Sequence, residues 1–101
     1  MEFERRPNTI RVSGRSNPNQ MAELLCELLG HFGKANMRAI GAAAINQTVK
    51  SIAIAGIRLV SSGAEIVCIP SFCEAVIRGK TLSAIQFAVE VRWPDTIQIA
   101  A

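Results

Sequence analysis

Basic side chains lie around the predicted turns of this chain and are its clearest candidates for binding chemistry. Arg11 and Arg15 flank the first turn, and Arg78 and Lys80 flank Gly79 in a later one. Lys and Arg contacts to phosphate groups release counterions and dominate the affinity of proteins for nucleic acid. The net charge is only +3, so the same residues also suit a solvated surface that keeps an apolar oligomer in solution. Both interpretations stay open at this point.

The turn Ser13–Asn17 is a second candidate for anion binding, because it precedes a predicted helix. Unpaired N–H groups and the helix dipole favour an anion at such an N-terminus. The turn matches neither a Walker loop nor a dinucleotide-binding fingerprint. Helix capping by Asn17, with Gln20 in the position of a capping box, explains the same residues without any ligand.

Asn46 and Lys50 interrupt an otherwise apolar segment. They lie one helical turn apart, so their side chains point the same way and could bind a phosphate or a base edge. The alternative is a hydrogen-bonded polar cluster, including Gln47, that fixes the register of a subunit interface. The residues do not decide between these two roles.

Catalytic and metal-binding residues are scarce, because the chain has one histidine and three cysteines. Cys26 with His31, and Cys68 with Cys73, lack the spacing of zinc knuckles, and no pattern brings a base to a thiol. We therefore expect reduced cysteines, no metal, no cofactor and no enzymatic activity. Tyrosine is absent and aromatic residues make up 5%, which offers no platform for stacking single-stranded bases.

Hydrophobic periodicity predicts the elements that must position these side chains. Asn17 and Pro18 begin the first helix, Gly33 ends it, and Gly41 turns the chain into the second. Arg78-Gly79-Lys80 is the predicted tip of a hairpin. In chain order we predict strand Thr9–Ser13, helix Pro18–Phe32, strand Asn36–Ile40, helix Ala42–Ser61, strand Glu65–Ile69 ended or kinked by Pro70, and strand Leu82–Val91.

The second helix is apolar on more than one side, which predicts burial on more than one side. Its predicted inner stripe is Ile45, Val49, Ile52, Gly56 and Leu59 or Val60. In so small a domain, a second subunit is the simplest partner that could bury the other apolar side of this helix. We therefore expect part of a dimer interface there. The first helix has a simpler inner face, formed by Met21, Leu24, Leu25, Leu28 and Leu29.

The resulting βαβαββ order predicts an α+β fold. Right-handed crossovers make the first three strands parallel, which brings both strand-to-helix turns and the hairpin tip to one end of the sheet.

Length and composition favour one folded domain. With 101 residues the chain is too short for a two-domain or barrel enzyme, and 50% hydrophobic content excludes disorder. So much apolar material on a small domain predicts a homodimer or a higher homo-oligomer. The charged N-terminus and the lack of a long apolar run predict a soluble, cytoplasmic protein without membrane partners. We expect tails at 1–8 and 93–101 around a domain at 9–92.

The segment RAIGAAAINQTVKSIAIAG, from Arg38 to Gly56, resembles the stage V sporulation protein S family. The resemblance continues through VSGRSNPNQ, IVCIPSF and SAIQFAVEV, and so covers most of residues 9–92. It implies an Alba-like fold, a two-layer sandwich of two helices on a four-stranded mixed sheet of order 1-2-4-3, and usually a dimer. This agrees with the βαβαββ order predicted from the residues.

The same resemblance implies a function. Alba-like proteins bind DNA or RNA as dimers through the loop before the first helix, the second helix and a long β-hairpin, and sporulation proteins of this type regulate bacterial development. The chain departs from the pattern of the family in two places. The hairpin tip is Arg-Gly-Lys where the family is often acidic, and GIRLVSSG replaces the family's usual residues after IAIA. By position, the implied contacts are Arg15, Ser16, Asn46, Lys50, Arg78 and Lys80.

We therefore hypothesise a non-enzymatic, dimeric regulator that binds the phosphate backbone of DNA or RNA, with Arg11 added to those contacts. The alternative is a protein-interaction scaffold of bacterial development or sporulation that does not bind nucleic acid directly. A third hypothesis is a small module that binds a phosphate ligand or a nucleotide.

Overall fold

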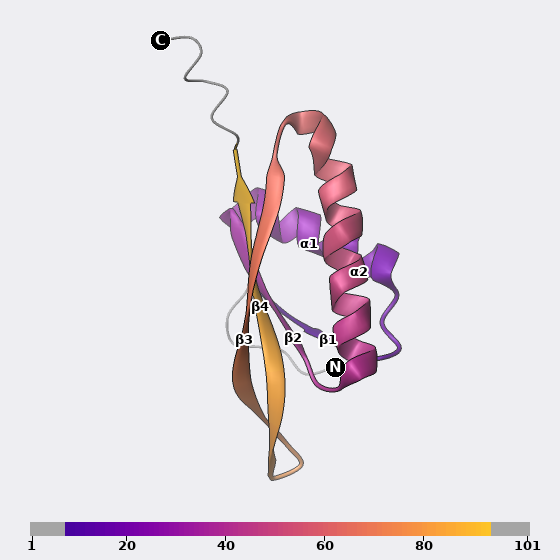
Figure 1. Cartoon of the computed structure of the whole chain (residues 1–101), viewed down its shortest axis with the longest axis vertical. Coiled ribbons are helices and arrows are strands. Elements are labelled where there is room, and N and C mark those ends of the chain that lie inside the picture. The colour runs from indigo at the N-terminus through magenta and orange to yellow at the C-terminus, as the bar shows by residue number, and fades with distance from the viewer. Residues whose placement is uncertain (1–7, 94–101) are drawn as a thin grey trace.

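Two helices lie on one face of a four-stranded sheet in the computed structural model, which describes residues 8–93 (Figure 1). The chain order βαβαββ and the α+β class are those predicted. The elements are β1 (Thr9–Val12), α1 (Pro18–Phe32), β2 (Lys34–Ala39), α2 (Ala42–Leu59), the 3-10 helix η1 (Val60–Ser62), β3 (Glu65–Ile77) and β4 (Lys80–Arg92). The remaining residues of the two predicted tails, 1–7 and 94–101, lie outside the described residues.

Helix α1 has the bounds predicted from its capping residues. The Asn17 side chain accepts hydrogen bonds from the backbone N–H groups of Asn19 (2.9 Å) and Gln20 (3.2 Å). At the other end Gly33 has a φ of 75°, and its N–H donates to the Leu29 carbonyl at 2.8 Å. A glycine tolerates this left-handed conformation and so ends the helix.

The sheet has the order β1-β2-β4-β3. Strands β1 and β2 pair in parallel, whereas β4 runs antiparallel to both β2 and β3. The first three strands therefore run in the same direction, as the crossover argument predicts. The order itself is the one implied by the family resemblance.

Strand β3 continues past Pro70 to Ile77, so Pro70 does not end the strand, and that part of the prediction is wrong. Pro70 pairs in register with Phe87 in an uninterrupted antiparallel ladder. Proline has no N–H to donate, but β3 is an edge strand that pairs only with β4, and edge strands tolerate proline. The hairpin of β3 and β4 is therefore longer than the sequence indicated.

Helix α2 buries a different stripe from the predicted one. Its buried residues are Ala44, Thr48, Ser51 and Ala55. Both hydroxyls are satisfied within the helix, because Thr48 Oγ1 donates to the Ala44 carbonyl (2.8 Å) and Ser51 Oγ to the Gln47 carbonyl (2.7 Å). These small side chains form the contact face, whereas Ile45, Ile52 and Leu59 are only partly buried. The predicted inner residues Val49 and Val60 are exposed.

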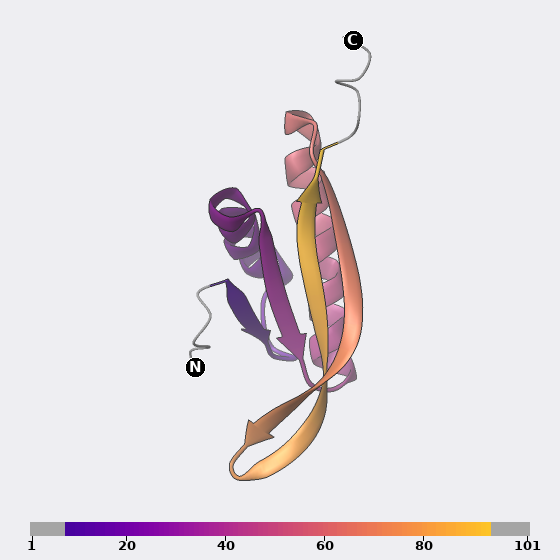
Figure 2. The same cartoon turned by 90° about the vertical axis from the view of Figure 1, so that its left-hand side faces the viewer.

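The core lies between the sheet and the two helices. Leu25 and Leu29 of α1 pack there as predicted, with Met37 of β2 and Val89 of β4. The opposite face of the sheet carries Arg11, Asn36, Arg38 and Gln86 and is not covered by a helix, as Figure 2 shows; we call it the open face. Neither described helix is long and apolar enough to cross a membrane.

Candidate functional site

The loop between β1 and α1 is built from serine hydrogen bonds. The Ser13 N–H donates to Ser16 Oγ at 2.9 Å, and the Ser16 N–H donates to the Ser13 carbonyl at 3.0 Å. The Arg15 N–H donates to Ser13 Oγ at 3.2 Å. The predicted site residue Ser16 thus holds the loop together, and its neighbour Arg15 extends into solvent.

This loop is packed against the first turn of α2. A Cβ added to Gly14 would lie 2.9 Å from the Ala43 Cβ, which is closer than an ordinary van der Waals contact. Gln47 Nε2 also donates to the Gly14 carbonyl at 3.4 Å. Gly14 therefore permits the approach that fixes Arg15 beside α2.

Asn46 and Lys50 lie on the exposed side of α2, as their spacing predicts. They share that side with exposed apolar residues, because Val49, Ala53 and Ile57 follow each other one helical turn apart. The two polar residues are thus embedded in an apolar stripe, which suits either role left open by the sequence.

The hairpin tip is a two-residue turn at Arg78 and Gly79, whose φ angles are 52° and 76°. Positive φ at both central residues is the signature of a tight hairpin turn whose twist matches the strands. Arg78 is exposed within this turn, and Lys80 is the exposed first residue of β4. Figure 1 shows that the hairpin extends beyond the β1–α1 loop and the Gly41 turn at the same end of the molecule.

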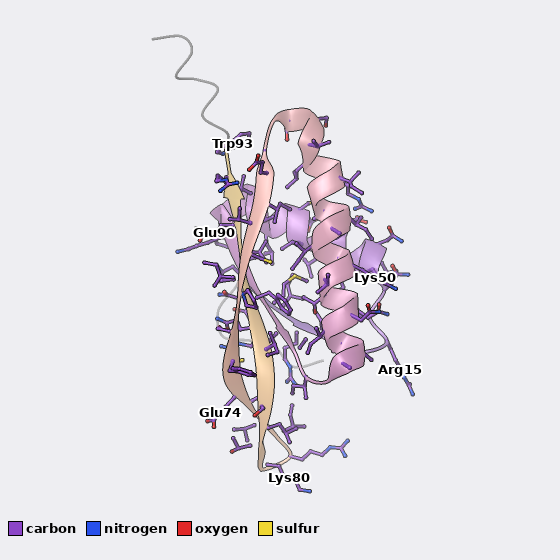
Figure 3. All side chains as sticks on the ribbon, in the orientation of Figure 1. Arg15, Lys50, Glu74, Lys80, Glu90 and Trp93 are labelled. Atoms are coloured by element: carbon purple, nitrogen blue, oxygen red, sulfur yellow. The ribbon has the colours of Figure 1, made fainter. Side chains whose placement is uncertain are left out.

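Arg11 does not lie with the other predicted site residues. It is half-buried on the open face of the sheet, where it pairs in register with Arg38. Arg15 and Lys50 project on the opposite, helical side (Figure 3). The predicted residues therefore fall into three places, namely the helical side, the hairpin tip and the open face.

Exposed cations lie on the helical side and at the tip. Within residues 8–93, no ion pair involves Arg15, Lys50, Arg78 or Lys80. Glu74 and Glu90 project on the side of the sheet away from Lys50 (Figure 3). The ion pair between Arg92 and Glu65, with an N–O distance of 2.6 Å, lies at the base of the hairpin, since Glu65 and Arg92 are the register pair farthest from its tip.

Comparison with protein families supplies an independent finding. The sequence model of the family described as stage V sporulation protein S (SpoVS) matches residues 8–92. The chain belongs to this family. Membership supports a sporulation-related role for the chain and agrees with the resemblance noted in its sequence.

The cysteines of this SpoVS chain are separated in the fold. Cys26 is half-buried on α1, and burial raises the pKa of its thiol above the ordinary value, while the nearby Arg58 charge lowers it to a smaller extent. Cys68 is exposed on β3 and Cys73 is half-buried on the same strand. No group of three side chains suited to a metal ion is found between residues 8 and 93.

Sequence reasoning missed two features of the SpoVS chain. The first is Arg38, whose Nε donates to Gln86 Oε1 at 2.9 Å on the open face. Alternation along β2 and β4 places both side chains there, but only the pairing register shows that they meet. The second is an apolar surface on β3, where Phe72 is 86% exposed.

Proposed function

We propose that this SpoVS-family chain is a non-enzymatic, dimeric regulator that binds the phosphate backbone of nucleic acid. One observation carries the proposal: four exposed cations from three separate segments lie on the helical side and at the hairpin tip, without acidic partners in the described chain. These cations are Arg15, Lys50, Arg78 and Lys80. Phosphate contacts need such exposed, uncompensated charge, and they supply most of the sequence-independent affinity.

The arrangement of these cations also supports contacts with a long polyanion. The loop carrying Arg15 is held against α2, the helix that carries Lys50, through Gly14. The hairpin adds two further cations at a distance from them (Figure 3). A small anion would not bridge these positions, whereas a nucleic-acid backbone presents phosphates at regular intervals.

Dimerisation is supported by the apolar surface. Ile57 on α2 is 73% exposed and Phe72 on β3 is 86% exposed. Large contiguous apolar patches are uncommon on monomers and mark interaction sites. A second copy of the chain is the simplest partner for this surface, because a symmetric dimer would bury the same apolar residues on both subunits. The exposed members are Val49 and Ile57 of α2, Val60 of η1, and Phe72 and Val76 of β3, whereas the exposed Ile69 lies on the other face of β3.

The nucleic-acid proposal is tested by titrating a labelled duplex, a single strand and a structured RNA at two salt concentrations. We expect the affinity for nucleic acid to fall steeply as the salt concentration rises. Lys50→Glu and Arg15→Glu should each reduce the slope of log affinity against log salt by about the contribution of one phosphate contact or more. Lys34→Glu is the matched control, because Lys34 is exposed but begins β2 at the other end. Unchanged affinity in the Lys50 and Arg15 variants would refute this interface.

The dimer is tested by measuring mass in solution over a range of protein concentrations. Phe72→Ser should shift the chain towards monomer, whereas Phe32→Ser is the matched control, because Phe32 is exposed at the end of α1. If the Phe72 variant keeps its mass, the second copy does not cover β3.

The apolar surface also favours the alternative function, a protein-interaction scaffold for development. A partner recovered in stoichiometric amount after nuclease treatment, and lost with Phe72→Ser, would support that alternative. Failure of every nucleic acid to bind near physiological salt would then leave the scaffold as the better proposal.

A further inference from the structure

A cleft with a volume of about 350 Å³ lies on the open face, away from the cations of the helical side. One wall is the end of β1 and the following residues, and the floor includes Arg38 and Ile40 of β2 and its turn. The other wall is the arm of the hairpin, which curves below the ends of β1 and β2 in Figure 2. The lining residues that matter below are Arg11, Arg38, Glu74, Ala75 and Ala84.

Two arginines define the chemistry of this cleft. Arg11 and Arg38 are register partners on adjacent parallel strands, so their side chains leave the sheet side by side on the same face. Both are half-buried. The Nε of Arg38 donates to Gln86 Oε1 at 2.9 Å, which orients the guanidinium plane. Paired, oriented guanidinium groups match the oxygen geometry of phosphate better than lysines do.

Small residues keep the cleft open. Ala84 of β4 and Ala75 of β3 contribute only methyl groups to the wall formed by the hairpin arm. A larger side chain at either position would occupy the volume beside the arginines. The cavity is therefore built into the pairing of the hairpin, where Ala84 is the register partner of Cys73 and Ala75 that of Leu82.

Glu74 of β3 is a further lining residue and brings a negative charge to the hairpin arm. Within residues 8–93, the Glu74 carboxylate makes no hydrogen bond or ion pair, and it projects from β3 on the side of the sheet away from Lys50 (Figure 3). A carboxylate accepts hydrogen bonds only, so it favours a ligand group with N–H donors. It also repels a second phosphate, and this makes the cleft a poor place for a continuous nucleic-acid backbone.

We propose that this cleft binds a small phosphate monoester that also carries N–H donors, such as a nucleoside monophosphate. Arg11 and Arg38 take the phosphate, and Glu74 accepts from the donor group. Guanine suits the second role, because its adjacent N–H groups can both donate to one carboxylate. The proposal does not depend on the nucleic-acid interface, since Arg11, Arg38 and Glu74 are not among the four cations of that interface, although the cleft borders the same loop and hairpin.

The test is calorimetric titration with GMP, inorganic phosphate and guanosine. We expect saturable binding of GMP, weaker binding of phosphate and none of guanosine. Arg38→Gln and Arg11→Gln should each weaken GMP and phosphate by about tenfold or more, because each removes a charged hydrogen-bonding partner. Arg38→Lys should recover only part of the loss, since lysine keeps the charge without the planar fork. Glu74→Gln should weaken GMP while leaving phosphate unchanged or tighter.

Lys50→Gln is the matched control, because it removes a cation from the helical side, and GMP affinity should be unchanged. Thermal unfolding of each variant shows that it is folded, and Arg11→Gln and Arg38→Gln test the site from two different strands. The proposal fails if the wild-type chain binds neither GMP nor phosphate at millimolar ligand, or if binding survives both arginine substitutions. Loss of nucleic-acid binding in Lys50→Glu with GMP binding retained would separate this site from the proposed interface.

Discussion

Replacing Gly14 with alanine tests whether the β1–α1 loop is packed against α2 as tightly as the structure indicates. The added Cβ would lie 2.9 Å from the Ala43 Cβ, so loop and helix must move apart by a few tenths of an ångström or more. Gly14 does not have a positive φ, so alanine brings no backbone strain of its own. The steric contact alone decides the sign of the effect.

The expected magnitude follows from two opposing terms. Overpacking costs about 1–3 kcal/mol, whereas the reduced freedom of the unfolded chain returns about 0.4–1 kcal/mol. Gly14→Ala should therefore lower the free energy of unfolding by about 1–2 kcal/mol, and each kcal/mol should lower Tm by about 4–8 °C in a domain of this size. Because Arg15 follows Gly14 directly, nucleic-acid affinity should fall as well.

Urea unfolding at one fixed protein concentration measures this change, with Gly30→Ala as the control. Gly30 lies in α1 with nothing within 4 Å of an added Cβ, so alanine there should raise stability by about 0.5–1 kcal/mol. Ala43→Gly should relieve the clash, giving a coupling of about 1 kcal/mol between the two substitutions. If Gly14→Ala is as stable as Gly30→Ala, the reasoning about this contact is refuted.

Three further predictions concern the cap, a thiol and the hairpin turn. Asn17→Ala should cost about 0.5–2 kcal/mol of unfolding free energy, because two N–H groups lose their acceptor, while Asn19→Ala should be nearly neutral in the same urea titration. Alkylation at pH 8, followed by mass spectrometry, should label Cys68 before Cys26, because burial raises the pKa of Cys26 and so reduces its thiolate fraction; equal rates would contradict this. Arg78→Asn should raise stability slightly, because asparagine adopts positive φ more readily, yet weaken nucleic-acid binding; unchanged binding would remove the turn from the interface.

The elements of the fold were largely readable from local chemistry. Asn17, Pro18 and Gly33 act within one or two turns of their own helix, so the bounds of α1 were predicted correctly. The Arg78-Gly79 turn is equally local. The end of β3 was predicted wrongly, because whether proline stops a strand depends on whether that strand lies at a sheet edge.

The inner face of α2 could not be chosen from the sequence. Apolar residues surround the helix, so hydrophobic periodicity alone offers several stripes. In the structure the buried residues of α2 are Ala44, Thr48, Ser51 and Ala55. All four are small enough for close packing, and the hydroxyls of Thr48 and Ser51 donate to backbone carbonyls of the same helix. The larger Val49 and Ile57 are left exposed as a consequence.

The sequence by itself determined the order of elements, the family, and the gathering of basic loops at one end, because capping, periodicity and crossover handedness act locally or follow from chain order. Only the tertiary structure decided which face each cation occupies. Strand pairing places Arg11 beside Arg38 on the open face, while Gly14 packing holds Arg15 on the helical side. Strand register and packing bring together residues that are distant in the chain. Composition and local sequence patterns do not indicate which of these residues will meet.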